Sequence, residues 1–274
     1  MYEPTFIPSL KKFPLQLSDS RFAVRHDRRF ISPDEPGLDP IHIHDYTEII
    51  VHIGGTLSFS VSGQLYSLKK GDIVISRRNE LHVGVFQKPE EYEYFCIWID
   101  DGKQSPLLDF LENLHAPILS LDAETQKKMY NLLLSMTDSK GSHLQQAADF
   151  LQFLALLQLT KKQVEQNNAF PQPLQEILND IRKNAADIPS TRALATRHFI
   201  SDATLDRWFK KHLHVSPHVF LESEKLALSS KLLLSGASVT EACMRSGFSS
   251  CSYFISRFKN KFGKTPLQYK NRRE

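Results

Sequence analysis

Two histidines and a glutamate near residue 45 are the side chains of this 274-residue chain best suited to chemistry. His42 and His44 are two residues apart, so on an extended strand both imidazole rings point to one face, and Glu48 keeps the same parity. Imidazole nitrogens and carboxylate oxygens bind first-row divalent metal ions, and they also hydrogen-bond polar small molecules. The same residues can also be satisfied parts of a protein core. A metal site, a ligand pocket and a structural role therefore remain open.

The segment around these residues has the pattern of short β-strands. Its β-rich runs are separated by turn pairs such as Gly54-Gly55 and Ser62-Gly63. The predicted strands are His44–Ile53, Thr56–Val61, Gln64–Leu68, Asp72–Ser76, His82–Gln87 and Tyr92–Ile99. Short strands at this spacing favour a small barrel or sandwich. Before about residue 40 the chain is rich in proline, and we expect an arm with one or two edge strands.

This segment resembles the cupin barrel. The first cupin motif matches His42-Ile43-His44, Glu48 and Gly55, and the second matches Gly71-Asp72 followed by His82. In metal-binding cupins, the residues at the positions of His42, His44, Glu48 and His82 hold a divalent ion. We predict instead that these four residues line the binding site of a small-molecule effector, with no metal and no cofactor. A polar, histidine-rich lining suits a carbohydrate.

A second stretch with a specific pattern, GFSSCSYFISRFKNKFGKTP, runs from Gly247 to Pro266. At 100° per residue, the apolar side chains share one side of a helix: Cys251, Phe254, Ile255, Phe258 and Phe262. Small polar and basic side chains share the other side: Ser249, Ser252, Tyr253, Ser256, Lys259 and Asn260. A short helix that Ser238 can cap precedes this stretch, and Gly247 supplies the turn. Such a pair of helices suits entry into a DNA major groove, although an apolar helix alone could simply belong to a core.

The same plan occurs about 50 residues upstream, in Thr191–Leu213. Leu205, Trp208, Phe209 and Leu213 share its buried side. The two units align with Phe199 on Phe248, Phe209 on Phe258, Lys210 on Lys259 and Pro217 on Pro266. Two units with the same residue types at these matching positions indicate an internal repeat.

Residues 174–274 resemble the double helix-turn-helix domain of the AraC/XylS family of bacterial transcription regulators. The residues that carry the resemblance include Ala193-Leu194-Ala195, Phe199-Ile200-Ser201, Phe209-Lys210-Lys211, Ser216-Pro217, Gly247-Phe248, Tyr253-Phe254, Arg257-Phe258-Lys259, Phe262-Gly263 and Thr265-Pro266. His214 departs from the pattern, because the family usually has glycine there. The resemblance implies a homodimeric transcription activator that binds double-stranded DNA and RNA polymerase and responds to an effector. A metal-dependent cupin enzyme, an isomerase or a dioxygenase with an accessory basic domain, is the alternative.

The exposed face of each second helix holds the predicted DNA contacts. In the first unit these are Ala203, Thr204, Asp206, Arg207 and Lys210, where Arg207 would read guanine and Asp206 would accept from cytosine. In the second unit Ser252, Tyr253 and Ser256 are placed for bases. The predicted phosphate contacts are Ser201, Lys211, Ser249, Ser250, Arg257, Lys259 and Lys261. For each basic residue, a solvated surface charge is the alternative.

Charge is divided unequally along the chain. Residues 174–274 carry 17 Lys+Arg against 9 Asp+Glu, a net charge of +8, and residues 1–173 carry 17 against 22, a net charge of −5. This asymmetry is typical of a protein in which one half meets phosphates. The three cysteines lack metal-type spacing, and no apolar run approaches membrane-spanning length. We therefore expect a cytoplasmic protein without a membrane segment or disulfides.

The predicted organisation is a two-domain α+β protein. Residues 1–160 would form a cupin-like β-barrel with a helical hairpin, 161–173 a linker, and 174–274 an all-α double helix-turn-helix domain. The hairpin helices are Asp122–Thr137 and Leu144 to about Gln166. The second of these is apolar around most of its circumference, which requires cover on two sides. We expect one side to pack on the barrel and the other to form a homodimer seam, with an intramolecular contact as the alternative.

Overall fold

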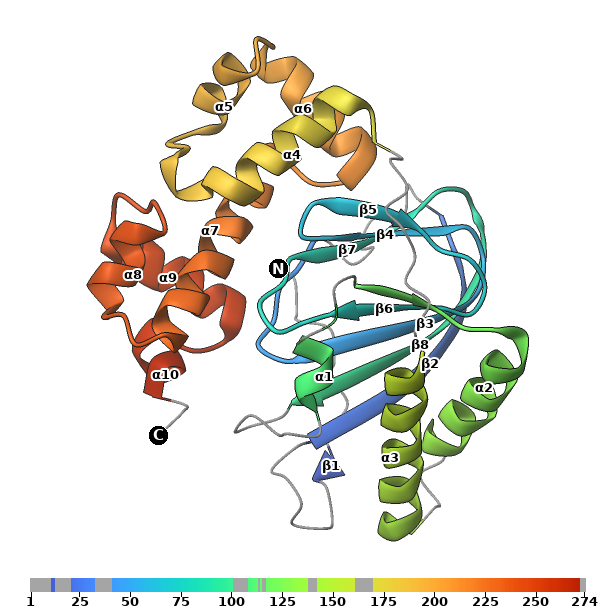
Figure 1. Ribbon diagram of the computed structural model, residues 1–274. Helices are drawn as coiled ribbons and strands as arrows, with labels where there is room; N and C mark the ends of the chain where they lie inside the picture. The colour runs from blue at the N-terminus through green and yellow to red at the C-terminus, as the bar shows by residue number, and fades with distance from the viewer. Residues whose placement is uncertain are drawn as a thin grey trace.

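The computed structural model has a β-rich N-terminal half and a helical C-terminal half that lie side by side (Figure 1). It describes residues 11–12, 21–32, 41–100, 108–112, 114, 117–137, 142–160 and 170–271. Most of the predicted linker, residues 161–169, lies outside these ranges. The last two residues of that prediction belong to the first helix of the C-terminal half, because this helix begins at Gln172.

The described strands form two antiparallel sheets. They are β1 (Lys11–Lys12), β2 (Arg21–Ile31), β3 (Thr47–Gly54), β4 (Leu57–Val61), β5 (Gln64–Ser67), β6 (Asp72–Ser76), β7 (His82–Phe86), β8 (Glu90–Asp100) and β9 (Ile118–Ser120). One sheet has the order β1-β2-β8-β3-β6-β9 and the other has the order β5-β4-β7. The six predicted strands are confirmed as β3 to β8. The long β2 is more than an edge strand, because it pairs with β8 along its whole length.

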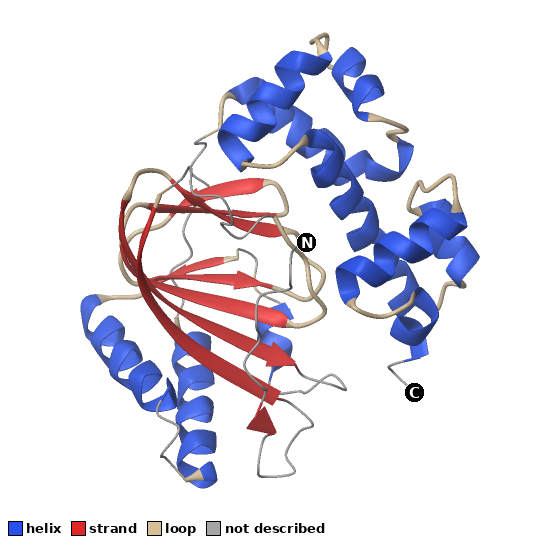
Figure 2. Ribbon diagram, turned by 180° about the vertical axis from the view of Figure 1, so that it is seen from behind, coloured by secondary structure: helices blue, strands red, loops and turns tan. Residues whose placement is uncertain are grey.

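The predicted cupin-like barrel takes the form of two facing sheets. Among the described residues the two sheets face each other as layers, and an isolated bridge between His42 and His82 stands outside the named strands. Figure 2 shows both layers beside the helical half. The architecture is therefore a cupin-like pair of antiparallel sheets followed by a helical domain.

Alternation along β3 separates two apolar layers. Ile49 and Val51 pack in one buried cluster with residues of α2 (Ala123–Thr137) and α3 (His143–Leu159), which cover the large sheet. Ile50 belongs to the clusters on the opposite face. Glu48 shares the parity of Ile50, so it also points away from the helices. Parity on this strand therefore places Glu48 on the face opposite the helical hairpin.

Helix α3 packs with only part of its surface. Phe150 stacks on Phe22 of β2 with ring centroids 4.2 Å apart, and Phe153 and Leu157 are fully buried. Leu144 and Leu159, at its two ends, are 67% and 72% exposed. An apolar stripe thus faces away from the sheet.

The C-terminal half contains two helix-turn-helix units joined by a long helix. Its helices are α4 (Gln172–Asn184), the short 3-10 turn η2 (Ala185–Asp187), α5 (Thr191–Arg197), α6 (Asp202–Leu213), α7 (Pro217–Leu234), α8 (Val239–Arg245), α9 (Cys251–Phe262) and α10 (Pro266–Lys270). A hydroxyl caps the first turn of six of these helices by accepting a backbone amide hydrogen: Ser190, Ser201, Ser216, Ser238, Ser250 and Thr265. Each of these helices therefore begins at a capping residue that can be recognised in the sequence, which is why the repeat could be predicted.

The alignment of the two units is right for the second helices and wrong for the turns. The residue numbers of α9 and its cap are 49 higher than those of α6 and its cap. The residue numbers of α8 are only 48 higher than those of α5. The second turn has one extra residue, so Phe199 corresponds to Gly247, and both have positive φ, 55° and 80°. Phe199 is 96% exposed, while Phe248, its predicted equivalent, is buried.

A prediction follows for the residues that end α6 and α9. His214 and Gly263 both adopt the left-handed conformation, with φ of 54° and 70°. Because a side chain is strained there, His214→Gly should raise the free energy of unfolding by up to about 1 kcal/mol. Gly263→Ala should lower it by about 1 kcal/mol. Denaturant titration measures both, and a destabilised His214→Gly variant would contradict this account of the helix ends.

Candidate effector site and DNA interface

The four residues predicted to bind an effector meet between the sheets. His42, His44, Glu48 and His82 each offer one atom that could ligate a metal ion, and these four atoms lie within 4.8 Å of one another. The Nε2 atom of His82 is 2.8 Å from Oε2 of Glu48, and the Nε2 atoms of His42 and His44 are 3.6 Å and 3.7 Å from the same oxygen. Three elements converge here: the segment before β3, β3 itself and the first residue of β7.

Hydrogen bonds around the cluster fix two of its imidazole rings. Nδ1 of His44 donates to the carbonyl of Tyr46, and Nδ1 of His82 donates to the carbonyl of Glu80, both at 2.8 Å. A carbonyl can only accept, so each Nδ1 carries the hydrogen and each neutral ring turns an Nε2 lone pair toward Glu48. The Nε2 atom of His44 is buried and has no hydrogen-bond partner.

The other oxygen of Glu48 is satisfied by the protein. Oε1 accepts from Nε1 of Trp98 at 2.8 Å and from Sγ of Cys96 at 2.9 Å. Burial alone would raise the pKa of Glu48, but the side chains of His42, His44 and His82 beside it hold it well below its usual range. Burial lowers the pKa of His82 to about 4, with His42 adding to the effect. At neutral pH His82 is therefore a neutral imidazole beside the Glu48 carboxylate.

Such a set of acceptors needs a cation or hydrogen-bond donors from outside the protein. Three imidazoles and one carboxylate fit a first-row divalent ion, and the two histidine-to-carbonyl bonds are the usual outer support of such ligands. Hydroxyl groups of a polar small molecule would satisfy the same lone pairs. The donor set thus fits both occupants, and our prediction of a ligand site without metal stays a prediction.

Backbone contacts join this cluster to the second helix-turn-helix unit. The carbonyl of Ile41, next to His42, accepts from Nζ of Lys261 at 3.4 Å. The amide of Asn79 donates to the carbonyl of His44 at 2.9 Å, and Oδ1 of Asn79 accepts from the hydroxyl of Tyr269 at 2.9 Å. Lys261, which we predicted to touch phosphate, faces the N-terminal half instead, and burial lowers its pKa to about 8.

Apolar contact continues this interface along the small sheet. Val83 and Val85 of β7 share a buried cluster with Leu174 and Leu178 of α4. At Gly63, in the β4–β5 turn, φ is 74° and an added Cβ would lie 3.5 Å from the Cβ of Leu178. The tight turn therefore lets α4 approach the sheet closely (Figure 1).

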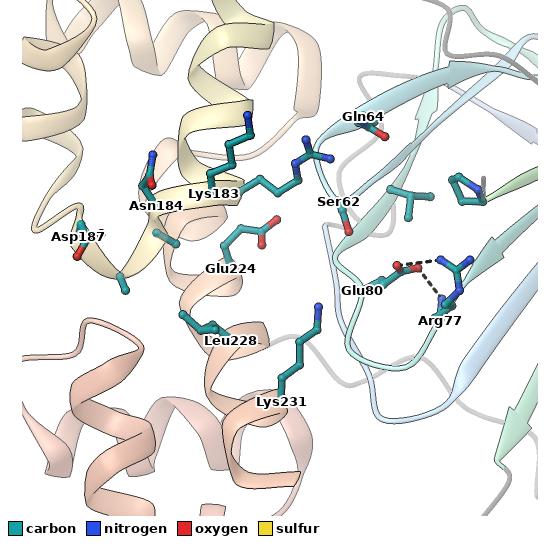
Figure 3. Close-up of a pocket in the computed structure, with 15 residues that line it drawn as sticks. Ser62, Gln64, Arg77, Glu80, Lys183, Asn184, Asp187, Glu224, Leu228 and Lys231 are labelled. Atoms are coloured by element: carbon teal, nitrogen blue, oxygen red, sulfur yellow. Dashed lines mark hydrogen bonds and ion pairs between the residues drawn. The ribbon is translucent and has the colours of Figure 1, made fainter. Parts of the chain in front are cut away.

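A cavity of about 410 Å³ lies between the two halves. Figure 3 shows Glu224 and Lys231 of α7 opposite Ser62, Arg77 and Glu80 of the N-terminal half. Arg77 pairs with Glu80 at 3.2 Å, but Oε1 of Glu224 is buried without a hydrogen-bond partner. Burial raises the pKa of Glu224 to about 7, against the opposing charges of Lys231 and Arg182.

The predicted DNA contacts of the first unit lie on the open side of α6. Ser201, Ala203, Arg207, Lys210 and Lys211 are exposed, and Thr204 and Asp206 are half-buried. Asp206 pairs with Lys210 at 2.7 Å, so it is not free to read cytosine unless that surface pair opens. Arg207 is the exposed fork-shaped donor of this helix, which suits guanine.

In the second unit, Glu222 of α7 binds two of the residues predicted to contact DNA, Tyr253 and Arg257. The hydroxyl of Tyr253 donates to Oε1 of Glu222 at 2.5 Å, and Arg257 donates to Oε2 through Nε at 2.9 Å. Burial alone would raise the pKa of Glu222, but the hydrogen bonds from Arg257 and Tyr253 lower it. Ser249, Ser250, Ser252, Ser256 and Lys259 are exposed around them.

Sequence reasoning missed the role of Glu222. The residue lies on α7, and its partners lie 31 and 35 residues further along. The sequence gives no local signal for this role, because Glu222 is followed by the polar residues Ser223, Glu224 and Lys225. Glu222 therefore orients Tyr253 and Arg257 from behind, and it is itself buried.

Comparison with known proteins identifies the class that this fold and site define. A model of the AraC-like ligand binding domain matches residues 29–154, and a model of a helix-turn-helix domain matches residues 194–272. A ligand-binding domain followed by a helix-turn-helix domain defines a ligand-responsive transcription regulator. The chain belongs to the AraC/XylS family of transcription regulators.

Similar full-length proteins agree with this assignment. The HTH-type transcriptional activator RhaS of Escherichia coli O139:H28 is 25% identical over 262 residues, which is 89% of this chain and 92% of RhaS. RhaS of Shigella sonnei is 24% identical over the same shares. The solved structure of ToxT from Vibrio cholerae O395 is 14% identical, with a TM-score of 0.38 over 92% of this chain and 99% of ToxT, a likeness too low to add to the argument.

The buried carboxyl of Glu224 generates a pH prediction. Its folded pKa of about 7 lies above the ordinary value of 4.5, so between these limits the folded chain binds more protons than the unfolded chain. Stability should therefore fall as the pH rises through this window. Glu224→Gln should stabilise the chain at pH ~8 by about 1 kcal/mol or more and have little effect at pH ~4.5.

Denaturant titration at the two pH values measures this difference. Glu176→Gln, on the exposed face of α4, is the matched control because it removes a charge that is not buried. Equal effects of Glu224→Gln at both pH values would contradict a raised pKa at the interface.

Proposed function

We propose that this protein is a sequence-specific transcription activator, and not an enzyme, that acts in the cytoplasm. The observation that carries the proposal is the pair of helix-turn-helix units, each with an exposed polar second helix. Two relatives that match most of the chain are named transcriptional activators. In the part of the chain that the structure describes, no helix is long and apolar enough to cross a membrane.

The effector of this regulator binds at His42, His44, Glu48 and His82. Its hydroxyl groups would donate to the Nε2 atoms of the histidines and to Oε2 of Glu48, which suits a carbohydrate or another polyol. A divalent metal ion is the second candidate, favoured by the two histidine-to-carbonyl bonds. Elemental analysis of the purified chain separates them, because about one metal ion per chain would exclude a metal-free sugar site.

Effector binding would act on DNA binding through the contacts between the halves. The segment that holds His42 and His44 also touches Lys261 and, through Asn79, Tyr269. An occupant that moves these histidines changes the contacts that position α9 and α10. An effector shifts the DNA-binding half only if it prefers one arrangement of the halves. The predicted linker, residues 161–173, would be a second path for this effect.

The apolar stripe of α3 is the proposed homodimer seam. Leu144, Ala148, Leu151, Ala155 and Leu159 recur at helical spacing along its length. Leu144, Ala148, Ala155 and Leu159 are exposed, and Leu151 is half-buried. Two copies would cover these stripes mutually, and the paired DNA-binding halves would contact RNA polymerase at a promoter.

The DNA-reading role predicts different outcomes for two basic residues. Arg207→Ala should cost about 1–3 kcal/mol on the preferred duplex and relax the sequence preference, because a base contact is lost. Lys259→Ala should weaken binding to all duplexes alike, because a phosphate contact carries no sequence information. Selection from a random duplex library with the unmodified chain, followed by affinity measurements on selected and random duplexes, tests both.

Two results would contradict this reading of DNA. If the unmodified chain selects no sequence, the proposed function fails. If Arg207→Ala loses affinity equally for selected and random duplexes, Arg207 does not read a base.

The seam on α3 predicts a change of oligomeric state. Leu144→Asp and Leu159→Asp place charges on the exposed stripe, so they should convert a dimer to a monomer without loss of fold. Gln152→Asp, at an exposed polar position of the same helix, is the control. Sedimentation measures the mass, and a dimer that persists in both leucine variants would rule out this seam.

A further inference from the structure

The second helix-turn-helix unit contains two thiols in contact. Cys243 is buried near the middle of α8, and Cys251 is the half-buried first residue of α9. Their Sγ atoms are 2.9 Å apart, and both cysteines are free. The third cysteine, Cys96, lies in the N-terminal half against Glu48.

The local fold holds these thiols together. Gly247, with φ of 80°, turns the chain between α8 and α9, and the amide of Phe248 donates to the carbonyl of Cys243 at 3.1 Å. An added Cβ at Gly247 would lie 2.3 Å from the carbonyl oxygen of Ala186, so this turn is closely packed. A disulfide has an S–S distance of about 2.05 Å, which the two sulfurs can reach by a shift of less than about 1 Å.

We propose that Cys243 and Cys251 are a site of oxidative modification, at which a hydroperoxide converts the two thiols to a reversible disulfide. Cys251 reacts first because it is the more accessible thiol. Its thiolate attacks the peroxide oxygen, which yields a sulfenic acid and, after protonation, water or an alcohol. The sulfur of Cys243 then attacks the sulfenic sulfur, the S–O bond breaks, and the hydroxyl leaves as water with the thiol proton of Cys243.

The order of these steps agrees with the surroundings of the buried thiol. Burial, then the hydrogen bond with Cys251, raises the pKa of Cys243 to about 12, so it stays protonated until it meets the sulfenic acid. Both electrons lost by the two sulfurs go to the peroxide. A cellular dithiol reverses the reaction by thiol–disulfide exchange.

The disulfide changes the start of the second recognition helix. Cys251 lies directly between Ser250 and Ser252, two of the predicted DNA contacts, and Ser250 caps α9. Drawing Cys251 toward α8 moves this first turn relative to the groove. This consequence rests on the proposed DNA-reading function, whereas the disulfide itself does not.

Thiol titration of the full chain tests the modification. After a small excess of hydrogen peroxide, free thiols should fall from three to one, and dithiothreitol should restore them. Cys96→Ser should still lose both remaining thiols, while Cys243→Ser and Cys251→Ser should form no internal disulfide. Conversion of Cys251 to sulfinic acid with Cys243 still free, found by peptide mass spectrometry, would overturn the proposal.

Affinity for the duplex that the reduced chain selects tests the consequence. The oxidised chain should bind about tenfold more weakly, the size expected when a contact of one unit is displaced, and dithiothreitol should restore binding. Equal affinities of fully disulfide-bonded and reduced chain would overturn the effect on α9. If the reduced chain selects no duplex, the proposed function fails, and the thiol count still decides whether the disulfide forms.

Discussion

The buried carboxylate of Glu48 is the constraint on which the rest of the structure depends. An ionised carboxylate between two sheets is costly unless it is paired and hydrogen-bonded. Trp98 and Cys96 bind one oxygen from β8, and His82 meets the other from β7. The large sheet, the small sheet and the segment before β3 are thereby held at one point.

This arrangement places the histidine cluster next to the DNA-binding half. Ile41, the neighbour of His42, contacts α9, and Asn79, which donates to the carbonyl of His44, contacts α10. The small sheet also shares a buried cluster with α4. The helical half is therefore packed against the sensor and is not an independent module on a tether. Two domains with an interface of this kind can adopt more than one relative arrangement. An effector that binds one arrangement better shifts the population toward it.

Local signals in the sequence were sufficient for the parts of the fold that depend on neighbours along the chain. Hydroxyl caps, turn glycines and helical periodicity predicted α6 and α9, and alternation predicted β3 to β8. A spacing that resembles the cupin motifs singled out the four residues of the histidine cluster, and the structure brings them together. The extra residue in the second turn was invisible because both turns end in the same kind of cap.

Features set by contacts between distant segments could not be predicted. Glu222 acts on Tyr253 and Arg257 only because α7 passes behind α9. Lys261 was expected to face DNA, since its position on α9 allows it, but the docking of the two halves turns it toward Ile41. The two layers of sheet follow from pairings across the chain, such as β2 with β8, that periodicity does not specify.

The central claim is that the histidine cluster and the second helix-turn-helix unit are coupled through Asn79. A double-mutant cycle on DNA affinity tests it most directly, with Glu48→Gln to perturb the cluster and Tyr269→Phe to remove the hydroxyl that contacts Asn79. The account predicts that the two changes are not additive, with a coupling free energy of about 0.5–2 kcal/mol. Strict additivity would contradict it and would leave the two halves as independent parts of one chain.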